Sequence, residues 1–127
     1  MKVMMNNGVF FCDTYALIEI IKGSKDYEIY TDSLLITSDL NLMELFYFLL
    51  RTYGKSKALE YFTEWEDIAV PIPKYVILKA MELKLIYKKE KLSYVDCMGY
   101  TYAQDNNILF LTGDAKFENK SGVEYIK

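Results

Sequence analysis

The chain has no histidine in its 127 residues. Without imidazole, Ser-His-Asp catalysis, Cys-His catalysis and general acid–base catalysis by histidine are all excluded. Histidine-containing zinc sites are excluded as well, and two cysteines cannot form a four-cysteine zinc site. If the protein is an enzyme, its chemistry must therefore use carboxylates, Lys, Tyr, Ser/Thr or Cys. Carboxylates, with 18 Asp and Glu residues, are the most numerous of these groups.

Positive charge is also scarce, since Arg51 is the only arginine and the formal net charge is −3. Proteins that bind nucleic acid mainly by electrostatic attraction normally have a basic surface, so this class is disfavoured. A small basic rim around an acidic, metal-filled site remains compatible with the composition. Of the four residues Lys88-Lys89-Glu90-Lys91, three are basic, and this segment either meets substrate phosphates or is a solvated helix end.

Long apolar runs and a signal-peptide pattern are missing too. No apolar stretch approaches the ~18 residues of a membrane-spanning helix, and the first residues lack the charged and apolar regions of a secretory signal. The two cysteines, Cys12 and Cys97, fit a reduced intracellular protein better than a disulfide scaffold. We therefore expect a cytoplasmic protein.

The apolar pattern predicts strands that alternate with helices in a single domain. The expected strands are 9–12, 34–37, 68–72, 108–111 and 123–126, and the expected helices are 15–22, 40–53, 55–65, 74–89 and 93–105. Such alternation is typical of an α/β domain with a mainly parallel sheet. In these sheets, functional sites form at the carboxyl ends of the strands.

Three carboxylates are expected at that edge of the sheet. Asp13 directly follows the first strand and precedes an apolar helix, while Asp114 comes shortly after the strand 108–111. Asp96 is near the start of its helix, which lies at the same edge if the crossover connections are right-handed. These acids could therefore meet in one pocket.

Glu44 is the fourth unusual acid, because it is the only charged residue in the segment from Leu42 to Leu50. A helix that is apolar nearly all round is expected to be buried nearly all round. An unpaired buried carboxylate costs several kcal/mol or becomes protonated. No basic residue lies within one helical turn of Glu44, so we expect a cation from outside to neutralise it.

Carboxylates that gather in one pocket repel each other, and a hard divalent cation relieves that repulsion. Mg²⁺ prefers carboxylate oxygen and water as ligands and needs no histidine. Each acid also has a purely structural alternative. Asp13 fits a helix N-cap, Asp96 fits a capping box with Ser93, Asp114 fits a turn or cap residue, and Glu44 fits a capping box with Asn41.

Four short motifs in this order resemble those of the PIN-domain ribonucleases, especially the small VapC-type toxins of prokaryotes. The motifs are the segments 11–18 (FCDTYALI), 38–44 (SDLNLME), 92–96 (LSYVD) and 110–117 (FLTGDAKF). The resemblance covers nearly all of the chain. It implies one PIN-like domain over residues 1–127, with a three-layer α/β/α fold and a mainly parallel sheet of about five strands.

The resemblance also implies an activity, namely Mg²⁺- or Mn²⁺-dependent endonucleolytic hydrolysis of RNA phosphodiester bonds. By match to the motifs, Asp13, Glu44, Asp96 and Asp114 would be the metal-site carboxylates, and the Thr112 hydroxyl would orient water or a carboxylate. A toxin of a type II toxin–antitoxin pair is expected, with a small antitoxin as partner and a homodimer as its assembly.

One position departs from the family pattern. Many members carry a further acid two positions after the fourth acid, and this chain has Lys116 there. The lysine weakens the case for a second tightly held metal and leaves open an alternative, a catalytically weak or inactive PIN-like module that binds RNA or protein. A phospho-accepting signalling domain that uses Asp13 is disfavoured, because neither Cys12 nor Thr14 provides the neighbouring acid it needs.

Overall fold

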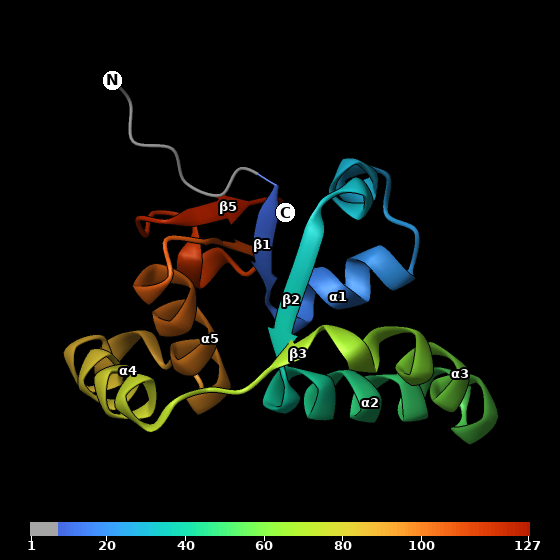
Figure 1. Ribbon diagram of the computed structural model, residues 1–127, viewed down its shortest axis with the longest axis horizontal. Coiled ribbons are helices and arrows are strands. Elements are labelled where there is room, and N and C mark those ends of the chain that lie inside the picture. The colour runs from blue at the N-terminus through green and yellow to red at the C-terminus, as the bar shows by residue number, and fades with distance from the viewer. Residues whose placement is uncertain (1–7) are drawn as a thin grey trace.

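The computed structural model describes residues 8–127, which form a five-stranded sheet between two groups of helices (Figure 1). The strands are β1 (Val9–Cys12), β2 (Leu34–Ser38), β3 (Ala69–Val70), β4 (Leu109–Thr112) and β5 (Val123–Tyr125). The helices are α1 (Thr14–Ile21), α2 (Asp39–Tyr53), α3 (Lys55–Trp65), α4 (Lys74–Ile86) and α5 (Tyr94–Asp105). Four 3₁₀ helices complete the fold: η1 (Lys25–Asp32), η2 (Glu66–Ile68), η3 (Lys88–Glu90) and η4 (Ala115–Phe117).

All neighbouring strands pair in parallel, in the order β3-β2-β1-β4-β5. The chain starts at the centre with β1, moves outward through β2 to β3, and then returns to the other side of β1 as β4. The order therefore reverses between β1 and β4, where α/β sheets usually bind their ligands. Cys12 is opposite Leu111 in this pair, so Asp13, which follows β1, and Thr112, the last residue of β4, lie side by side.

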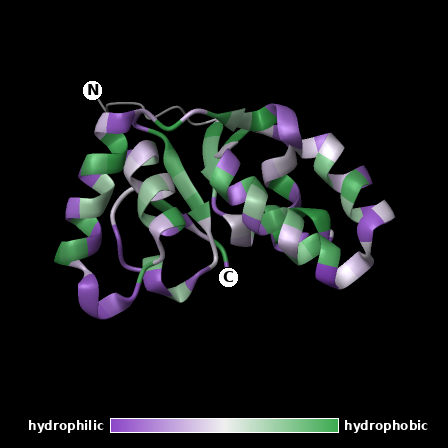
Figure 2. Ribbon diagram, turned by 90° about the horizontal axis from the view of Figure 1, so that it is seen from below, coloured by the Kyte–Doolittle hydropathy of each residue, from purple (hydrophilic) through white to green (hydrophobic). Residues whose placement is uncertain are grey.

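Side chains from the central strands alternate between two buried cores. Phe10 and Cys12 point toward α1, α2 and α3, whereas Phe11, between them, points toward α4 and α5. This alternation follows from the two-residue period of a strand. The central strands are hydrophobic along their length (Figure 2), as expected for a parallel sheet covered on both faces. The predicted α/β/α fold with a parallel sheet of five strands is confirmed.

Local sequence signals explain where several helices begin and end. Ser38 caps α2 by accepting a hydrogen bond from the backbone N–H of Asn41. Ser93 and Asp96 form a reciprocal capping box at the start of α5. Gly54 separates α2 from α3 with a backbone φ of +83°, a conformation that residues other than glycine rarely adopt.

Two element boundaries differ from the sequence prediction. The strand expected over 68–72 is only β3, at the edge of the sheet, because Ile68 ends a 3₁₀ turn and Pro71 and Pro73 follow. A proline cannot donate to the strand ladder, so pairing stops before Pro71. The helix expected over 74–89 ends at Ile86 and continues as η3. No helix within residues 8–127 is long and apolar enough to span a membrane.

Candidate active site at the carboxyl edge of the sheet

Asp13 lies at the centre of the candidate site, directly after β1 and only 4% exposed. Its Oδ1 accepts a hydrogen bond from the backbone N–H of Thr14 at 2.9 Å, so Asp13 caps α1. Its Oδ2 accepts one from the Thr112 hydroxyl at 2.7 Å, although the two residues are 99 positions apart. Asp13 therefore caps α1, as one of the two predictions had it, and the same carboxyl lies at the carboxyl edge of the sheet, as the other prediction required.

The carboxyl of Asp13 is held in an unfavourable electrostatic environment. Burial, together with the negative charges of Asp96 and Asp114, raises the pKa of Asp13 to about 7, against the lowering effect of its hydrogen bonds with Thr112 and Thr14. Burial also raises the pKa of Asp96, and the charge of Asp114 adds to that increase. The structure thus brings three of the four predicted acids close enough for their charges to repel one another.

Asp96 and Asp114 both serve as helix-capping residues. Asp96 accepts the backbone N–H of Ser93 at 2.9 Å within the capping box. Asp114 caps η4 by accepting the backbone N–H of Lys116 at 3.0 Å. The Thr112 hydroxyl in turn accepts the backbone N–H of Asp114 at 3.1 Å, which links Asp114 to Asp13 through one side chain. Capping fixes these carboxyl groups at the edge without using all of their lone pairs.

Glu44 has a different environment from the one that the sequence predicts. Helix α2 is not buried all round, because Met43 is 58% and Tyr47 63% exposed. Glu44 itself is half-buried, and its Oε1 accepts a hydrogen bond from the Thr14 hydroxyl at 2.6 Å. It therefore has an internal hydrogen-bond partner, which the sequence analysis did not predict. The capping box between Asn41 and Glu44 is absent too, since α2 begins at Asp39.

Asn41 is a site residue that the sequence analysis missed. It is buried, and its amide Nδ2 donates to the Thr14 hydroxyl at 3.0 Å while its Oδ1 accepts from the Ser38 hydroxyl at 2.7 Å. The network that starts at Ser38 thus reaches Glu44 through Thr14. A polar amide three residues after Ser38, in a helix rich in apolar residues, was the available signal.

Gly113 is the second missed residue, and it lies between Thr112 and Asp114 in the loop after β4. A Cβ atom at this position would lie 2.2 Å from Cε1 of Tyr15 and 2.3 Å from the backbone oxygen of Ile126. Real Cβ atoms do not approach other atoms so closely, so only glycine fits here without a backbone shift. Gly113 allows the loop to pack tightly and so positions both of its neighbours.

The chemistry of these side chains fits a divalent cation, although they do not enclose one directly. Within residues 8–127, no three Asp, Glu or Cys side chains lie close enough together to hold a metal ion as they stand. Burial of Asp13, together with the negative charges of Asp96 and Asp114, raises its pKa, and a bound cation would offset this cost. Mg²⁺ usually keeps several of its water ligands, so a few carboxylates suffice to hold it.

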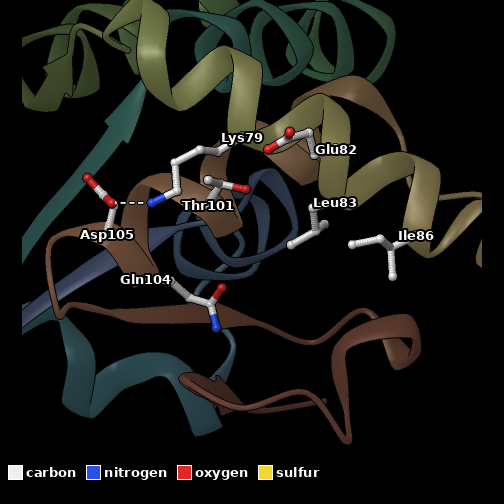
Figure 3. A pocket seen from close by; sticks show the side chains of 7 residues that line it. All are labelled: Lys79, Glu82, Leu83, Ile86, Thr101, Gln104 and Asp105. Atoms are coloured by element: carbon white, nitrogen blue, oxygen red, sulfur yellow. Dashed lines mark hydrogen bonds and ion pairs between the residues drawn. The ribbon is translucent and has the colours of Figure 1, made fainter.

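Other hollows of the molecule have different chemistry. One lies between α4 and α5, where the Lys79 ammonium and the Asp105 carboxylate pair at 2.6 Å (Figure 3). It also contains the buried hydroxyl of Thr101, which has no hydrogen-bond partner within the described part of the chain. An apolar groove between α2 and α3 is lined by Leu42, Met43, Phe46, Leu59, Phe62 and Asp39. Neither hollow is lined by any of the four predicted acids, which are Asp13, Glu44, Asp96 and Asp114.

The family model of the PIN domain matches residues 10–123 of this chain. The chain belongs to the PIN domain family. The match includes all four motifs and the fold that carries them, so the resemblance inferred from the motifs is confirmed. No curated protein matches the chain by sequence.

Solved structures with the same fold include toxins and toxin–antitoxin complexes. Mycobacterium tuberculosis VapC20, a Sarcin-Ricin loop cleaving toxin, matches with a TM-score of 0.74 and 18% identity over 93% of this chain and 99% of that one. A toxin–antitoxin complex from Klebsiella pneumoniae matches with a TM-score of 0.71 and 17% identity over 91% and 98%. VapBC2 from Rickettsia felis, bound to a promoter DNA fragment, matches with a TM-score of 0.72 and 15% identity over 93% and 97%. At these identities the likeness establishes a shared fold.

Proposed function

We propose that this PIN-domain protein is a metal-dependent endoribonuclease that hydrolyses RNA phosphodiester bonds with Mg²⁺ or Mn²⁺. The observation that carries the proposal is the buried carboxyl of Asp13, which Asp96 and Asp114 repel at the carboxyl edge of the sheet. A fold under no functional constraint would have little reason to keep this arrangement, because burying an ionised carboxylate beside others is costly. Perturbed pKa values of this kind are typical of catalytic sites.

The residues of the site have separable roles in this proposal. Asp13, Asp96 and Asp114 would hold the cation through carboxylate oxygens or through water. When bound, such a cation lowers the pKa of a water molecule and neutralises phosphate charge. The Thr112 hydroxyl fixes the orientation of the Asp13 carboxyl through its hydrogen bond to Oδ2.

Glu44 is suited to orient the attacking water. Its Oε1 is occupied by the Thr14 hydroxyl, and Thr14 is held in place by the Asn41 amide. The other carboxylate oxygen, Oε2, makes no hydrogen bond to any of residues 8–127. A carboxylate with one fixed and one free oxygen can accept a proton from water in a defined direction. No histidine is required at any step.

A cleavage assay on a labelled single-stranded RNA tests the proposal. We expect wild type to cleave in Mg²⁺ or Mn²⁺, and cleavage to be abolished by a chelator or by Asp13→Asn. Asp26→Asn is the matched control, because Asp26 is an exposed acid of η1 with no part in the site. Cleavage that survives both chelation and Asp13→Asn would overturn the proposal.

A catalytically inactive module that binds RNA or protein is the second candidate, and Lys116 at the family's fifth acidic position favours it. That function predicts binding of metal or RNA without any cleavage product. Quantitative cleavage that depends on Asp13 would exclude it.

We also propose that the protein acts as the toxin of a toxin–antitoxin pair, with a small protein antitoxin as partner. The structural neighbours include a toxin–antitoxin complex from Klebsiella pneumoniae and VapBC2 from Rickettsia felis. The groove between α2 and α3 offers an apolar surface for such a partner. Induced expression should arrest bacterial growth, and Asp13→Asn should remove the arrest. Growth arrest that persists in the Asn variant would contradict a toxic ribonuclease activity.

A homodimer is the assembly that we propose. Helix α4 supports this, because it exposes apolar side chains of Leu78, Leu85 and Ile86 at 69%, 69% and 76%. Light scattering after size exclusion should give twice the mass of 14.9 kDa. A monomer at micromolar concentration would contradict the proposed dimer.

A further inference from the structure

Lys116 lies at the exposed rim of the acidic site, on η4. Its backbone N–H donates to Asp114, and its Nζ donates to the carbonyl oxygen of Lys91 at 3.2 Å. Lys91 precedes the capping box that carries Asp96, so this bond connects the two loops that hold Asp96 and Asp114. The Lys116 ammonium is also near enough to Asp96 to favour its ionised form, which lowers the pKa of Asp96 against the effect of burial.

Lys116 differs in its contacts from two other lysines around this rim. Lys84 and Lys120 have structural partners. The Lys84 ammonium donates to the carbonyl of Leu92 and lies over the Tyr94 ring, while Lys120 pairs with Glu90.

Lys116 instead has a single neutral hydrogen-bond acceptor and makes no ion pair with any described residue. An exposed ammonium held in a fixed position, with hydrogen-bonding capacity to spare, is available for an anionic ligand.

A cleft of about 770 Å³ continues from this rim, and Lys116 is part of its lining together with Tyr87, Asn119 and Lys120. Lys116 therefore faces the cleft and acts electrostatically on Asp96 at the same time. Glu90 also lines the cleft and pairs with Lys120, and the Lys120 ammonium lies over the Tyr87 ring. Lys116 is therefore the cation of this cleft that remains available for a phosphate of the RNA backbone.

We propose that Lys116 binds a backbone phosphate of the RNA beside the acidic site and directs the strand into the cleft next to η4. The inference rests on the proposed ribonuclease function and names a substrate-binding residue for the same site. Lys116 stands where many family members have an acid, so this chain places a fixed positive charge where those proteins place a negative one.

The test measures binding of a fluorescein-labelled single-stranded RNA to the full chain in EDTA, by fluorescence anisotropy at a series of salt concentrations. We expect Lys116→Met to weaken binding about 3- to 10-fold, and to reduce the slope of log K against log[salt] by about 0.7, the loss of one phosphate contact on a single strand. Lys116→Arg keeps the charge and should keep both values.

The control is Lys57→Met, because Lys57 is an exposed lysine of α3 on the other side of the sheet (Figure 1). If Lys116→Met and Lys57→Met have the same affinity and the same salt slope, the proposal is overturned. Equal loss of binding in Lys116→Arg and Lys116→Met would also overturn it, because it would show that the lysine only supports the loop.

These outcomes are separable from those of the cleavage assay. Metal-dependent cleavage by wild type, combined with unchanged RNA binding by Lys116→Met, would leave the proposed function intact and refute only the role of Lys116. If Lys116→Met weakens RNA binding as expected but wild type does not cleave RNA, the nuclease is refuted and the RNA-binding site is retained. If wild type cleaves RNA in Mg²⁺ but binds none in EDTA, the role of Lys116 is refuted and the nuclease is retained.

Discussion

Replacing Asp13 by asparagine is expected to abolish RNA cleavage and, in a chelator at pH 8, to make the protein more stable. Burial and the charges of Asp96 and Asp114 raise the pKa of Asp13 from 3.8 to about 7. The folded state therefore binds this proton more tightly than the unfolded state does. Between pH 3.8 and about 7, the free energy of unfolding falls as pH rises. Above that range the full cost of the buried charge is present.

The magnitude follows from the size of the shift. A difference of about 3 pKa units corresponds to about 4 kcal/mol at 1.36 kcal/mol per unit. Asparagine is uncharged and avoids this cost, but it can accept only one of the two hydrogen bonds that the carboxylate accepts. The lost bond costs about 1 to 1.5 kcal/mol. We therefore expect a net gain of about 2 to 3 kcal/mol at pH 8, or about 10 °C in the thermal midpoint for a chain of this length.

Urea denaturation in EDTA at pH 5 and pH 8 measures this effect. The stability difference between the asparagine variant and wild type should be large at pH 8 and smaller by about 3 kcal/mol at pH 5, since the folded carboxyl is then mostly protonated. Mg²⁺ should raise the stability of wild type at pH 8 and have little effect on the variant. Asp26→Asn, at an exposed position, controls for the loss of one surface charge.

Two results would refute the reasoning. If the variant is less stable than wild type at pH 8, the hydrogen bonds of Asp13 outweigh the cost of its charge. If the difference between the two proteins does not change between pH 5 and pH 8, the carboxyl does not titrate in this range and the repulsion is not present.

Three further substitutions test the supports of the site. Gly113→Ala should lower the free energy of unfolding by roughly 2 to 4 kcal/mol in urea denaturation, because the new Cβ would meet Tyr15 and the Ile126 backbone. Gly8→Ala is the control, since there is open space around its Cβ. Equal stability of the two variants would contradict the packing argument. Thr14→Val should reduce kcat by about 10- to 100-fold and cost roughly 1 to 3 kcal/mol of stability through the unpartnered Asn41 amide, whereas Thr14→Ser should keep most of both. Thr112→Val should weaken Mn²⁺ binding in a calorimetric titration by about 10-fold or more, since the Asp13 carboxyl loses its orienting hydroxyl; unchanged affinity would remove Thr112 from the site.

The sequence was sufficient to predict most of the strands and helices and several of the polar residues that cap the helices. Short apolar segments predicted the strands, and a cap residue such as Ser93 predicted where a helix begins, because these signals act within a few residues. The boundaries around Pro71 were less accurate. There the pattern of apolar residues continues, but the backbone loses a hydrogen-bond donor.

Glu44 shows what an apolar pattern cannot distinguish. Its helix is rich in apolar residues on every side, which is compatible with complete burial and equally with an exposed apolar face. The structure has the second arrangement, with Met43 and Tyr47 exposed. Glu44 reaches Thr14, 30 positions away, so its partner depends on how α2 packs against α1. No local rule contains that information.

By itself, the sequence determined that the chemistry must do without histidine, that acids follow the central strands, and that a lysine stands at the family's fifth acidic position. Only the tertiary structure decided which of these groups act on one another. The pairing of β1 with β4 puts Asp13 against the Thr112 hydroxyl, and the loops after β4 and before α5 bring the Lys116 ammonium close to Asp96. The physical reason is that electrostatic and hydrogen-bond energies depend on distance and burial, which are set by contacts between residues far apart in the chain.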